Sequence, residues 1–281
     1  MAKPQQSYKN AAILTAEEKE LNLRRLMREM RTVLVAYSGG VDSSYLALIA
    51  RQELDTKAVC ITGISPSVSQ IQRREAEKIA KQFNFNYQTI KTEEMENPNY
   101  QANPTNRCYH CKTDLYGKLS LMAKNQEIEF VLDGANADDV GDYRPGRTAA
   151  AEKNVRSPLI EVGLNKNEIR ELSKKHNLST WDKPSSPCLA SRIAYGVPVT
   201  IERLSKVERG EAVLRSMGFR EFRVRVHEEI VRLEIAPDEM ERALNLETTK
   251  KLAEEFSRIG FKYVTLDLQG YRSGAMNEVL K

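Results

Sequence analysis

The stretch VAYSGGVDSS, residues 35–44, passes from apolar residues into two glycines, an aspartate and two serines. Gly39 and Gly40 allow a tight turn whose backbone N–H groups are not obstructed by side chains. A helix that begins directly after the turn would point its positive end at the same place. The stretch therefore predicts an anion-binding turn between a strand and a helix. The alternative is an ordinary strand-to-helix turn capped by serine and aspartate.

The turn contains no lysine. It matches neither the GxxxxGK[ST] pattern of P-loop kinases nor the GxGxxG pattern of dinucleotide-binding folds. A turn without a lysine that follows the γ-phosphate is better suited to holding pyrophosphate as it leaves. The hydroxyls of Ser38, Ser43 and Ser44 add donors for such a group, and Asp42 is placed to hold the Mg²⁺ that neutralises it.

Strand and helix patterns alternate in the first part of the chain. Strands are predicted at 32–37, 57–63, 86–90 and 130–135, and helices at 16–30, 42–54, 67–83 and after Cys108, with a loop at 96–106. Repeated βαβ units predict an α/β fold: a Rossmann-like parallel sheet with helices on both faces. Ligands of such sheets bind beyond the carboxyl ends of the strands.

The pattern changes near residue 197. Helices predicted at 201–217 and 238–258 flank a segment, 220–236, that alternates apolar and charged residues with a period of two and is typical of a strand or hairpin. The sequence therefore predicts two domains, 1–197 and 198–281, the second a smaller α+β domain for substrate binding or oligomerisation.

Charge and hydropathy limit the choice of partners. Lys and Arg total 43 against 39 Asp and Glu, a net charge of +4 that is too small and too dispersed to indicate a nucleic-acid coat. A small anionic substrate is sufficient to explain it. No apolar run approaches the roughly 20 residues of a membrane helix, and the start MAKPQQSYKN lacks the apolar centre of a signal peptide. We expect a cytoplasmic protein without a membrane partner.

The four cysteines occur in different settings. Cys60 lies in the apolar run KAVCITGI and is expected in the core, whereas Cys108 and Cys111 form a CxxC at a helix start. Cys188 follows two prolines and precedes Arg192, whose charge would lower a thiol pKa, so Cys188 is a candidate nucleophile. The alternative for Cys188 is a structural cysteine in a loop.

Five segments together carry a resemblance. SGGVDS (38–43) resembles the PP-loop of the ATP pyrophosphatases, which adenylylate a carbonyl or carboxyl oxygen and release pyrophosphate. Within that superfamily, the chain resembles the LarE family of sulfur transferases in DGANADDVGDYRPG (133–146), PSSPCLASRIAYG (184–196), FRVRVH (222–227) and YVTLDLQGYRSGAMN (263–277). The resemblance covers nearly the whole chain from about residue 20. It implies that ATP and Mg²⁺ activate a carboxylate of a pyridinium biscarboxylate mononucleotide, which then becomes a thiocarboxylate in nickel-pincer nucleotide biosynthesis.

The resemblance also assigns the cysteines. In the family, the cysteine at position 188 provides the sulfur and is lost as dehydroalanine. This chain departs from that pattern through its CxxC, and three-cysteine relatives are thought to bind a [4Fe–4S] cluster through Cys108, Cys111 and Cys188, with an open iron that carries sulfide. Two alternatives remain: zinc completed by a histidine (His110, His176 or His227), or a trio of cysteines that acts in redox chemistry or as a persulfide relay.

Other polar residues complete the predicted site. Asn136 and Asp138 follow a strand and would meet adenine, ribose or metal; Arg144, in a predicted DYRPG turn, would approach a phosphate. Arg223 and Arg225 share one strand face with His227 and either grip the phosphate of the mononucleotide or are simply solvated. The resemblance adds three further candidate substrate-binding residues, Arg192, Asp267 and Arg272. We expect a homo-oligomer; the rival functions are a tRNA thiolase and a non-catalytic nucleotide- or metal-binding module.

Overall fold

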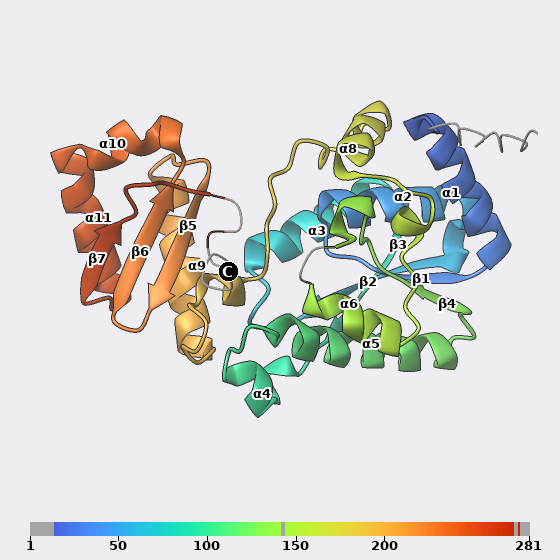
Figure 1. The fold of residues 1–281 in the computed structure, drawn as a ribbon, viewed down its shortest axis with the longest axis horizontal. Coiled ribbons are helices and arrows are strands. Elements are labelled where there is room, and N and C mark those ends of the chain that lie inside the picture. Colours follow the sequence, from blue (N-terminus) through green and yellow to red (C-terminus); the bar gives the residue numbers. More distant parts are fainter. Residues whose placement is uncertain (1–13, 142–143, 273–274, 276–281) are drawn as a thin grey trace, which may run out of the picture.

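The computed structural model describes residues 14–141, 144–272 and 275, which form two lobes side by side (Figure 1). The first lobe contains a four-stranded sheet in the order β3-β2-β1-β4, and all its neighbouring strands are parallel. The strands are β1 (Val33–Ala36), β2 (Ala58–Ile64), β3 (Asn86–Lys91) and β4 (Phe130–Leu132). The predicted parallel α/β sheet is therefore confirmed.

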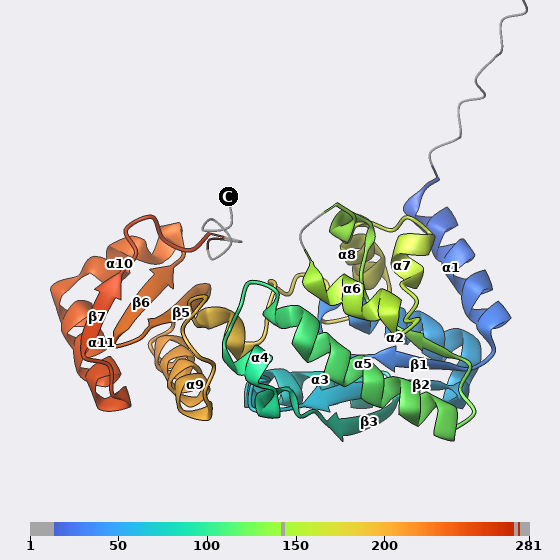
Figure 2. The ribbon, with the colours of Figure 1, turned by 60° about the horizontal axis from the view of Figure 1, so that its bottom comes forward.

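Helices cover both faces of this sheet (Figures 1 and 2). One face packs against α1 (Ala16–Met30), α2 (Val41–Leu54), α3 (Gln70–Gln82) and α8 (Lys166–Lys175), and the other against α5 (Arg107–Asn125) and α6 (Pro145–Glu152). Side chains of β1 alternate between the two cores, with Val33 and Val35 in the first and Leu34 in the second. Cys60 is fully buried in the first core, as predicted, and burial raises the pKa of its thiol to about 12.

The second lobe is the predicted small α+β unit. It contains α9 (Ile201–Ser216), β5 (Phe222–His227), β6 (Ile230–Ile235), α10 (Met240–Leu244), α11 (Leu246–Ile259) and β7 (Tyr263–Leu266). Strands β5 and β6 form an antiparallel hairpin, and β7 pairs parallel to β6 after the crossover through α10 and α11. The single helix predicted at 238–258 is two helices, because the side chain of Asn245 accepts hydrogen bonds from the first turn of α11 and starts a new helix there.

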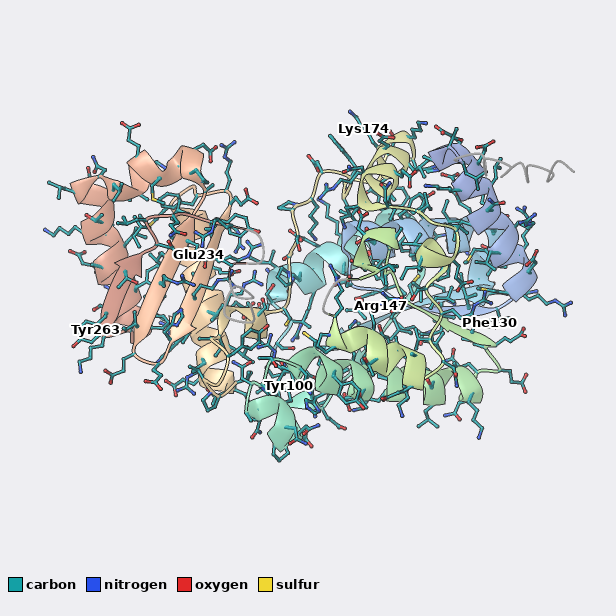
Figure 3. The ribbon with its side chains drawn as sticks, in the orientation of Figure 1. Tyr100, Phe130, Arg147, Lys174, Glu234 and Tyr263 are labelled. Atoms are coloured by element: carbon teal, nitrogen blue, oxygen red, sulfur yellow. The ribbon has the colours of Figure 1, made fainter. Side chains whose placement is uncertain are left out.

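The core of the second lobe includes residues from earlier in the chain. Tyr100, in the short helix α4 (Pro98–Gln101), is 1% exposed and packs with this core, as do Leu189, Ala190 and Ile193. Figure 3 shows Tyr100 where α4 approaches the second lobe. The domain boundary at 197/198 stays a prediction, and packing across it is extensive. The predicted loop at 96–106 therefore contains a helical turn whose tyrosine joins the two lobes.

Some predicted boundaries were wrong. The DYRPG turn is not a simple turn, because Pro145 occupies the first turn of α6, a position where its fixed φ and missing N–H are tolerated; residues 142–143 of this motif lie outside the described residues. Helix α5 begins at Arg107, so Cys108 lies inside the helix that was predicted to start after it, and the CxxC lies at the helix start as predicted. In the described ranges, no helix is both long and apolar enough to cross a membrane.

Candidate functional site

A cavity of about 600 Å³ lies beyond the carboxyl ends of β1 and β4 and extends to the second lobe. Its first-lobe lining includes Ser38, Gly40, Asp42, Ser43, Cys108 and Arg144, and its second-lobe lining includes Arg223, Arg225 and Tyr271. The edge of a parallel sheet where strands end is the place where such folds bind ligands. The predicted anion-binding turn and the predicted arginine strand therefore face one common space.

The turn after β1 has the geometry of an anion site. Gly39 has φ +71°, and a Cβ there would lie 2.7 Å from the Cβ of Ala76, so no larger residue fits. Gly40 is the N-cap of α2 and supplies no side-chain cap, which leaves the helix N-terminus available to a ligand. The Ser38 and Ser43 hydroxyls lie 3.0 Å apart in the cavity lining, but Ser44 is fully buried and does not reach it.

Asp42 is paired with a lysine from a distant helix. Its Oδ2 lies 2.6 Å from the Nζ of Lys166, whereas its Oδ1 is buried without a hydrogen-bond partner among the described residues. Such an oxygen suits a hard cation, so the residue fits the predicted Mg²⁺. Lys183 also reaches the turn: its Nζ donates to the Gly39 carbonyl at 3.2 Å and pairs with Glu75 at 2.7 Å. The turn has no lysine in its own sequence, but two lysines from later in the chain contact it.

The loop after β4 supports the turn. A Cβ at Gly134 would lie 3.0 Å from the backbone nitrogen of Ser43, so the two loops are in close contact. The Asn136 side chain accepts from the Asp138 N–H at 3.0 Å, and Asp138 accepts from the Lys166 N–H at 2.9 Å. Neither Asn136 nor Asp138 lines the cavity. Their hydrogen bonds hold loops together, and their predicted contact with ATP stays a prediction.

Three residues that the sequence reasoning missed line the cavity beside Cys108. The Tyr116 hydroxyl donates to Asp133 at 3.0 Å, and the Nζ of Lys112 lies 5.2 Å from the centroid of the Tyr116 ring. The interaction with Tyr116 raises the pKa of Lys112, which therefore stays protonated. Lys112 and Cys108 are four residues apart on α5, so the i, i+4 spacing was the available signal.

The three predicted cluster cysteines approach one another from two segments. Cys108 and Cys111 lie in the first turns of α5, and Cys188 is the N-cap of the 3₁₀ turn η4 (Leu189–Arg192). Cys108 is exposed at its surface, but desolvation by the surrounding protein, and then the charge of Cys188, raises the pKa of its thiol. Burial, Glu94 and Cys188 raise the pKa of Cys111. Cys111 and Cys188 pack against the second core. The thiols are thus close enough to influence one another electrostatically.

Sulfur donors suit a soft metal or a cluster. However, in the described parts of the chain, no group of three or more His, Cys, Asp or Glu side chains is arranged to hold a metal ion. His176, one of the histidines considered for zinc, instead lies 3.0 Å from Glu20 of α1. The cluster, the zinc site and the persulfide relay all stay predictions.

The two arginines of β5 are not solvated. Arg223 is 9% and Arg225 is 6% exposed, so the solvated-face alternative is wrong. Arg225 makes a bidentate pair with Glu234 at 3.0 and 2.9 Å, whereas Arg223 donates to the Ser185 carbonyl at 2.7 Å and to the Tyr271 hydroxyl at 3.2 Å. Within the described ranges, no carboxylate pairs with Arg223. Its positive charge therefore enters the cavity without a built-in counter-ion.

The remaining candidates lie outside this cavity. Arg192 is buried, its Nε lies 2.8 Å from Glu211, and it lines a second space of about 240 Å³ on the α3 and α9 side. Asp267 pairs at 2.8 Å with Arg232, which in turn lies 3.1 Å from Glu234. Arg272 does not line the cavity either. Their predicted roles in substrate binding stay predictions.

Comparison with known proteins places the chain in a family. The family model described as NAD synthase matches residues 16–114. An uncharacterised protein of Synechocystis sp. is 43% identical over 94% of this chain and 98% of its own length. The pyridinium-3,5-bisthiocarboxylic acid mononucleotide synthase of Lactiplantibacillus plantarum is 32% identical over 95% of this chain and 96% of its own length. An uncharacterised protein of Methanocaldococcus jannaschii is 30% identical over 91% of this chain and 98% of its own.

Members of the PP-loop and NAD synthase family use ATP. The structure agrees with these matches: it has the SGGVDS turn after β1, a parallel sheet and a cavity beyond the strand ends. The chain therefore belongs to the PP-loop ATP pyrophosphatase family, together with the pyridinium-3,5-bisthiocarboxylic acid mononucleotide synthase of L. plantarum.

Proposed function

We propose that the protein is an ATP-dependent sulfur transferase that converts a carboxylate of a pyridinium mononucleotide into a thiocarboxylate. One observation carries the proposal: a single cavity joins the anion-binding turn at Asp42 to the unneutralised arginine Arg223, with Cys108 on its wall. The likeness to the L. plantarum synthase over nearly the whole chain supports the substrate class.

The first chemical step belongs to the turn. A substrate carboxylate oxygen attacks the α-phosphorus of ATP, the bond from that phosphorus to the bridging oxygen breaks, and pyrophosphate leaves. The uncapped N-terminus of α2 and the hydroxyls of Ser38 and Ser43 stabilise the departing charge. Asp42 would hold Mg²⁺, which neutralises phosphate charge when it is bound. Arg223 would orient the substrate from the far end of the cavity.

The second step transfers sulfur. A sulfur nucleophile attacks the adenylylated carboxyl carbon, the carbon–oxygen bond breaks, and AMP leaves with the electron pair. If Cys188 is the nucleophile, loss of its α-proton and cleavage of its Cβ–Sγ bond leave dehydroalanine in the chain. If a cluster held by Cys108, Cys111 and Cys188 supplies sulfide, Cys188 survives turnover.

The products of ATP cleavage test the first step. We expect AMP and pyrophosphate in the presence of the mononucleotide, with thiocarboxylate formed in the same mixture, and both measured by chromatography. ADP as the main product would contradict the proposal. Transfer of sulfur to tRNA alone would favour the thiolase alternative, and bound ATP without turnover would favour the non-catalytic alternative.

The sulfur source has a separate test. Protein purified without oxygen would be assayed for iron, sulfide and zinc, for the wild type and for single alanine variants of each cysteine. The cluster route predicts that Cys108→Ala, Cys111→Ala and Cys188→Ala lose the brown colour while Cys60→Ala keeps it, because Cys60 belongs to the first core. Loss of the mass of H₂S from Cys188 during turnover supports the sacrificial route instead.

We also expect the protein to form a homo-oligomer. Large apolar side chains are exposed on the second lobe, among them Leu246 at 86% and Leu268 at 79% exposure. Light scattering after size-exclusion chromatography measures the assembly, and a monomeric mass at micromolar concentration would contradict this expectation.

A further inference from the structure

The buried arginines of the described chain differ in their counter-ions. Arg192 and Arg225 each pair with a buried glutamate. Arg223 faces the cavity, where a phosphate of the substrate is its proposed partner. Arg107 is 4% exposed, yet among the described residues no carboxylate pairs with it. A buried charge is costly unless it is paired, so Arg107 stands apart from the other three.

The contacts of Arg107 are with neutral groups. Its guanidinium donates to the side-chain oxygen of Asn103 and lies 6.0 Å from the centroid of the Tyr195 ring. Asn103 is fully buried and is itself fixed, since its amide nitrogen donates to the carbonyls of Ala194 and Val197 at 2.8 Å. These contacts hold the guanidinium in one place but leave its charge uncompensated.

The place of Arg107 in its helix adds to this positive charge. Arg107 is the first residue of α5, and this end of the helix has neither an acidic residue in its first turn nor a side-chain cap. A cation is normally disfavoured there, because the free backbone N–H groups already carry partial positive charge. Cys108 and Cys111 lie in the first turns of the same helix. The helix end and the buried guanidinium therefore favour a negative charge at the cysteines.

Arg107 and the sulfur atoms influence one another electrostatically. Burial alone would lower the pKa of Arg107, but negative charge on Cys188 and Cys108 raises it, so the guanidinium stays protonated. Conversely, desolvation raises the pKa of Cys108, and the charge of Arg107 opposes this rise. A buried carboxylate of the same region, Glu94, accepts from the Ser67 hydroxyl at 2.8 Å and pairs with no described arginine or lysine. Among the described residues, the cysteine sulfur atoms are therefore the best counter-ions for Arg107.

We propose that Arg107 is the counter-charge of the sulfur site: it compensates the negative charge of a sulfur anion carried by Cys108 or Cys188 before that sulfur is transferred. Sulfur attacks an activated carboxyl carbon as an anion, whether it is a thiolate, a persulfide or a sulfide. Arg107 acts through the cysteines and does not line the cavity, so it is a positioning residue. This inference rests on the proposed function, since it takes the cysteines as the sulfur site.

Two alkylating reagents that differ in charge test the inference on metal-free protein. Iodoacetate is an anion and iodoacetamide is neutral, but both react with the same thiolate. The ratio of their rate constants at one cysteine is therefore independent of the thiolate fraction and reports the local electrostatic potential. Mass spectrometry of the peptides that contain Cys108 and Cys188 gives the ratio at each. We expect Arg107→Gln to lower the iodoacetate-to-iodoacetamide ratio by about five- to tenfold, and Arg107→Lys to keep most of it.

The variants separate charge from structure. Glutamine and lysine can both donate to Asn103, so the charge is the relevant difference between the two variants. Lys118→Gln is the matched control: it removes a positive charge from the same helix, at a place where Glu93 compensates that charge at 2.7 Å. This control should leave the ratio unchanged. A fall in Arg107→Gln at Cys108, at Cys188 or at both supports the inference and identifies the sulfur that Arg107 stabilises.

Three results would overturn the inference. They are an unchanged ratio at both cysteines in Arg107→Gln, an equal fall in Arg107→Lys, and an equal fall in Lys118→Gln. A second measurement requires no variant and covers the case in which Arg107→Gln does not fold. In wild-type protein, the ratio at Cys108 should be several-fold higher in the native state than in urea, and an equal or lower native ratio would also overturn the inference.

These outcomes are distinct from those that test the proposed function. Alkylation requires no ATP, no mononucleotide and no sulfur transfer. If wild-type protein produced ADP or thiolated only tRNA, the proposed function would fail while the rate ratios kept their meaning. If wild-type protein made AMP, pyrophosphate and thiocarboxylate but the ratios did not depend on the charge of Arg107, only the inference would fail.

Discussion

The two ends of the cavity, at the turn after β1 and at strand β5, differ in how far their charged groups are paired within the protein. At the turn, Asp42 keeps one oxygen without a described partner, and the N-terminus of α2 has no side-chain cap. At the far end, Arg225 is paired with Glu234, which is 0% exposed and also contacts Arg232. Figure 3 shows Glu234 among the strands of the second lobe. The first end therefore leaves polar groups open to a ligand, whereas most charges at the second end are paired within the protein.

This difference gives the arginines of β5 distinct roles. Arg225 belongs to the internally neutralised group, but Arg223 meets only carbonyl and hydroxyl oxygens and the ring of Tyr271, 4.6 Å below its guanidinium. Among the described residues at this end of the cavity, Arg223 is therefore the one that brings an unbalanced charge, which a single phosphate would match.

The largest effect is expected at Asp42. Asp42→Asn should lower the rate of pyrophosphate release by about a thousand-fold, because a metal ligand is lost and metal stabilisation of phosphate charge contributes several kcal/mol. A coupled assay for pyrophosphate measures this rate. Stability should change little, because the ion pair that Asp42 makes with Lys166 is partly exposed and such pairs contribute about 0–1 kcal/mol. Asp138→Asn, which changes the supporting loop but no residue of the cavity lining, is the control, and equal losses in both variants would contradict a specific role of Asp42.

Removal of Arg225 should act mainly on stability. Arg225→Ala leaves the fully buried Glu234 with Arg232 alone, which should cost about 3–5 kcal/mol in the free energy of unfolding. Urea denaturation measures this loss. The double variant Arg225→Met with Glu234→Leu should recover most of it, because apolar side chains can replace a buried ion pair. A stable Arg225→Ala protein would refute the claim that this end is internally neutralised.

Arg223→Ala should act on substrate rather than on stability or ATP. Its loss should weaken use of the mononucleotide by about ten- to a hundred-fold, or about 1.5–3 kcal/mol, while the KM for ATP stays within a few-fold. Steady-state kinetics with each substrate varied in turn would reveal the split. Equal effects on the mononucleotide and on ATP would contradict a role of Arg223 that is specific to the mononucleotide end of the cavity.

The smallest effect concerns the cysteines between the two ends. Desolvation by the surrounding protein and the charge of Cys188 raise the pKa of Cys108, so its reactive thiolate forms only at higher pH than in an ordinary cysteine. In Cys188→Ala, one cause of the rise is gone, and the pH profile of Cys108 alkylation should move a fraction of a unit toward lower pH. Mass spectrometry of iodoacetamide-treated, metal-free protein measures the profile. A shift toward higher pH would contradict the proximity of the two thiols.

Local patterns predicted the turn and the sheet. The signals for β1, the two glycines and α2 lie within about twenty consecutive residues, so hydrophobic periodicity and turn chemistry were sufficient. The period of two in β5 also placed Arg223 and Arg225 on one face. It could not predict their burial, because that depends on Glu234 in the facing strand and on the Ser185 segment.

Contacts over long separations were not predictable from these patterns. Lys166 and Lys183 reach the turn across 124 and 144 residues, and nothing near either lysine indicates that partner. Pro145-Gly146 was ambiguous for a different reason, since proline is suited both to a turn and to the first turn of a helix. Burial and pairing at the site are products of the fold as a whole.

The place of Tyr100 in the second core has a consequence for folding during synthesis. The core that contains Tyr100 also includes Phe256 and Phe261, so roughly 160 more residues must be made before this core can close. At typical elongation rates of about 5–20 residues per second, the partner surface around Tyr100 stays incomplete for on the order of 8–30 s. The first lobe can form its parallel sheet on the ribosome during that time, but the cavity between the lobes takes shape only when the chain is nearly finished.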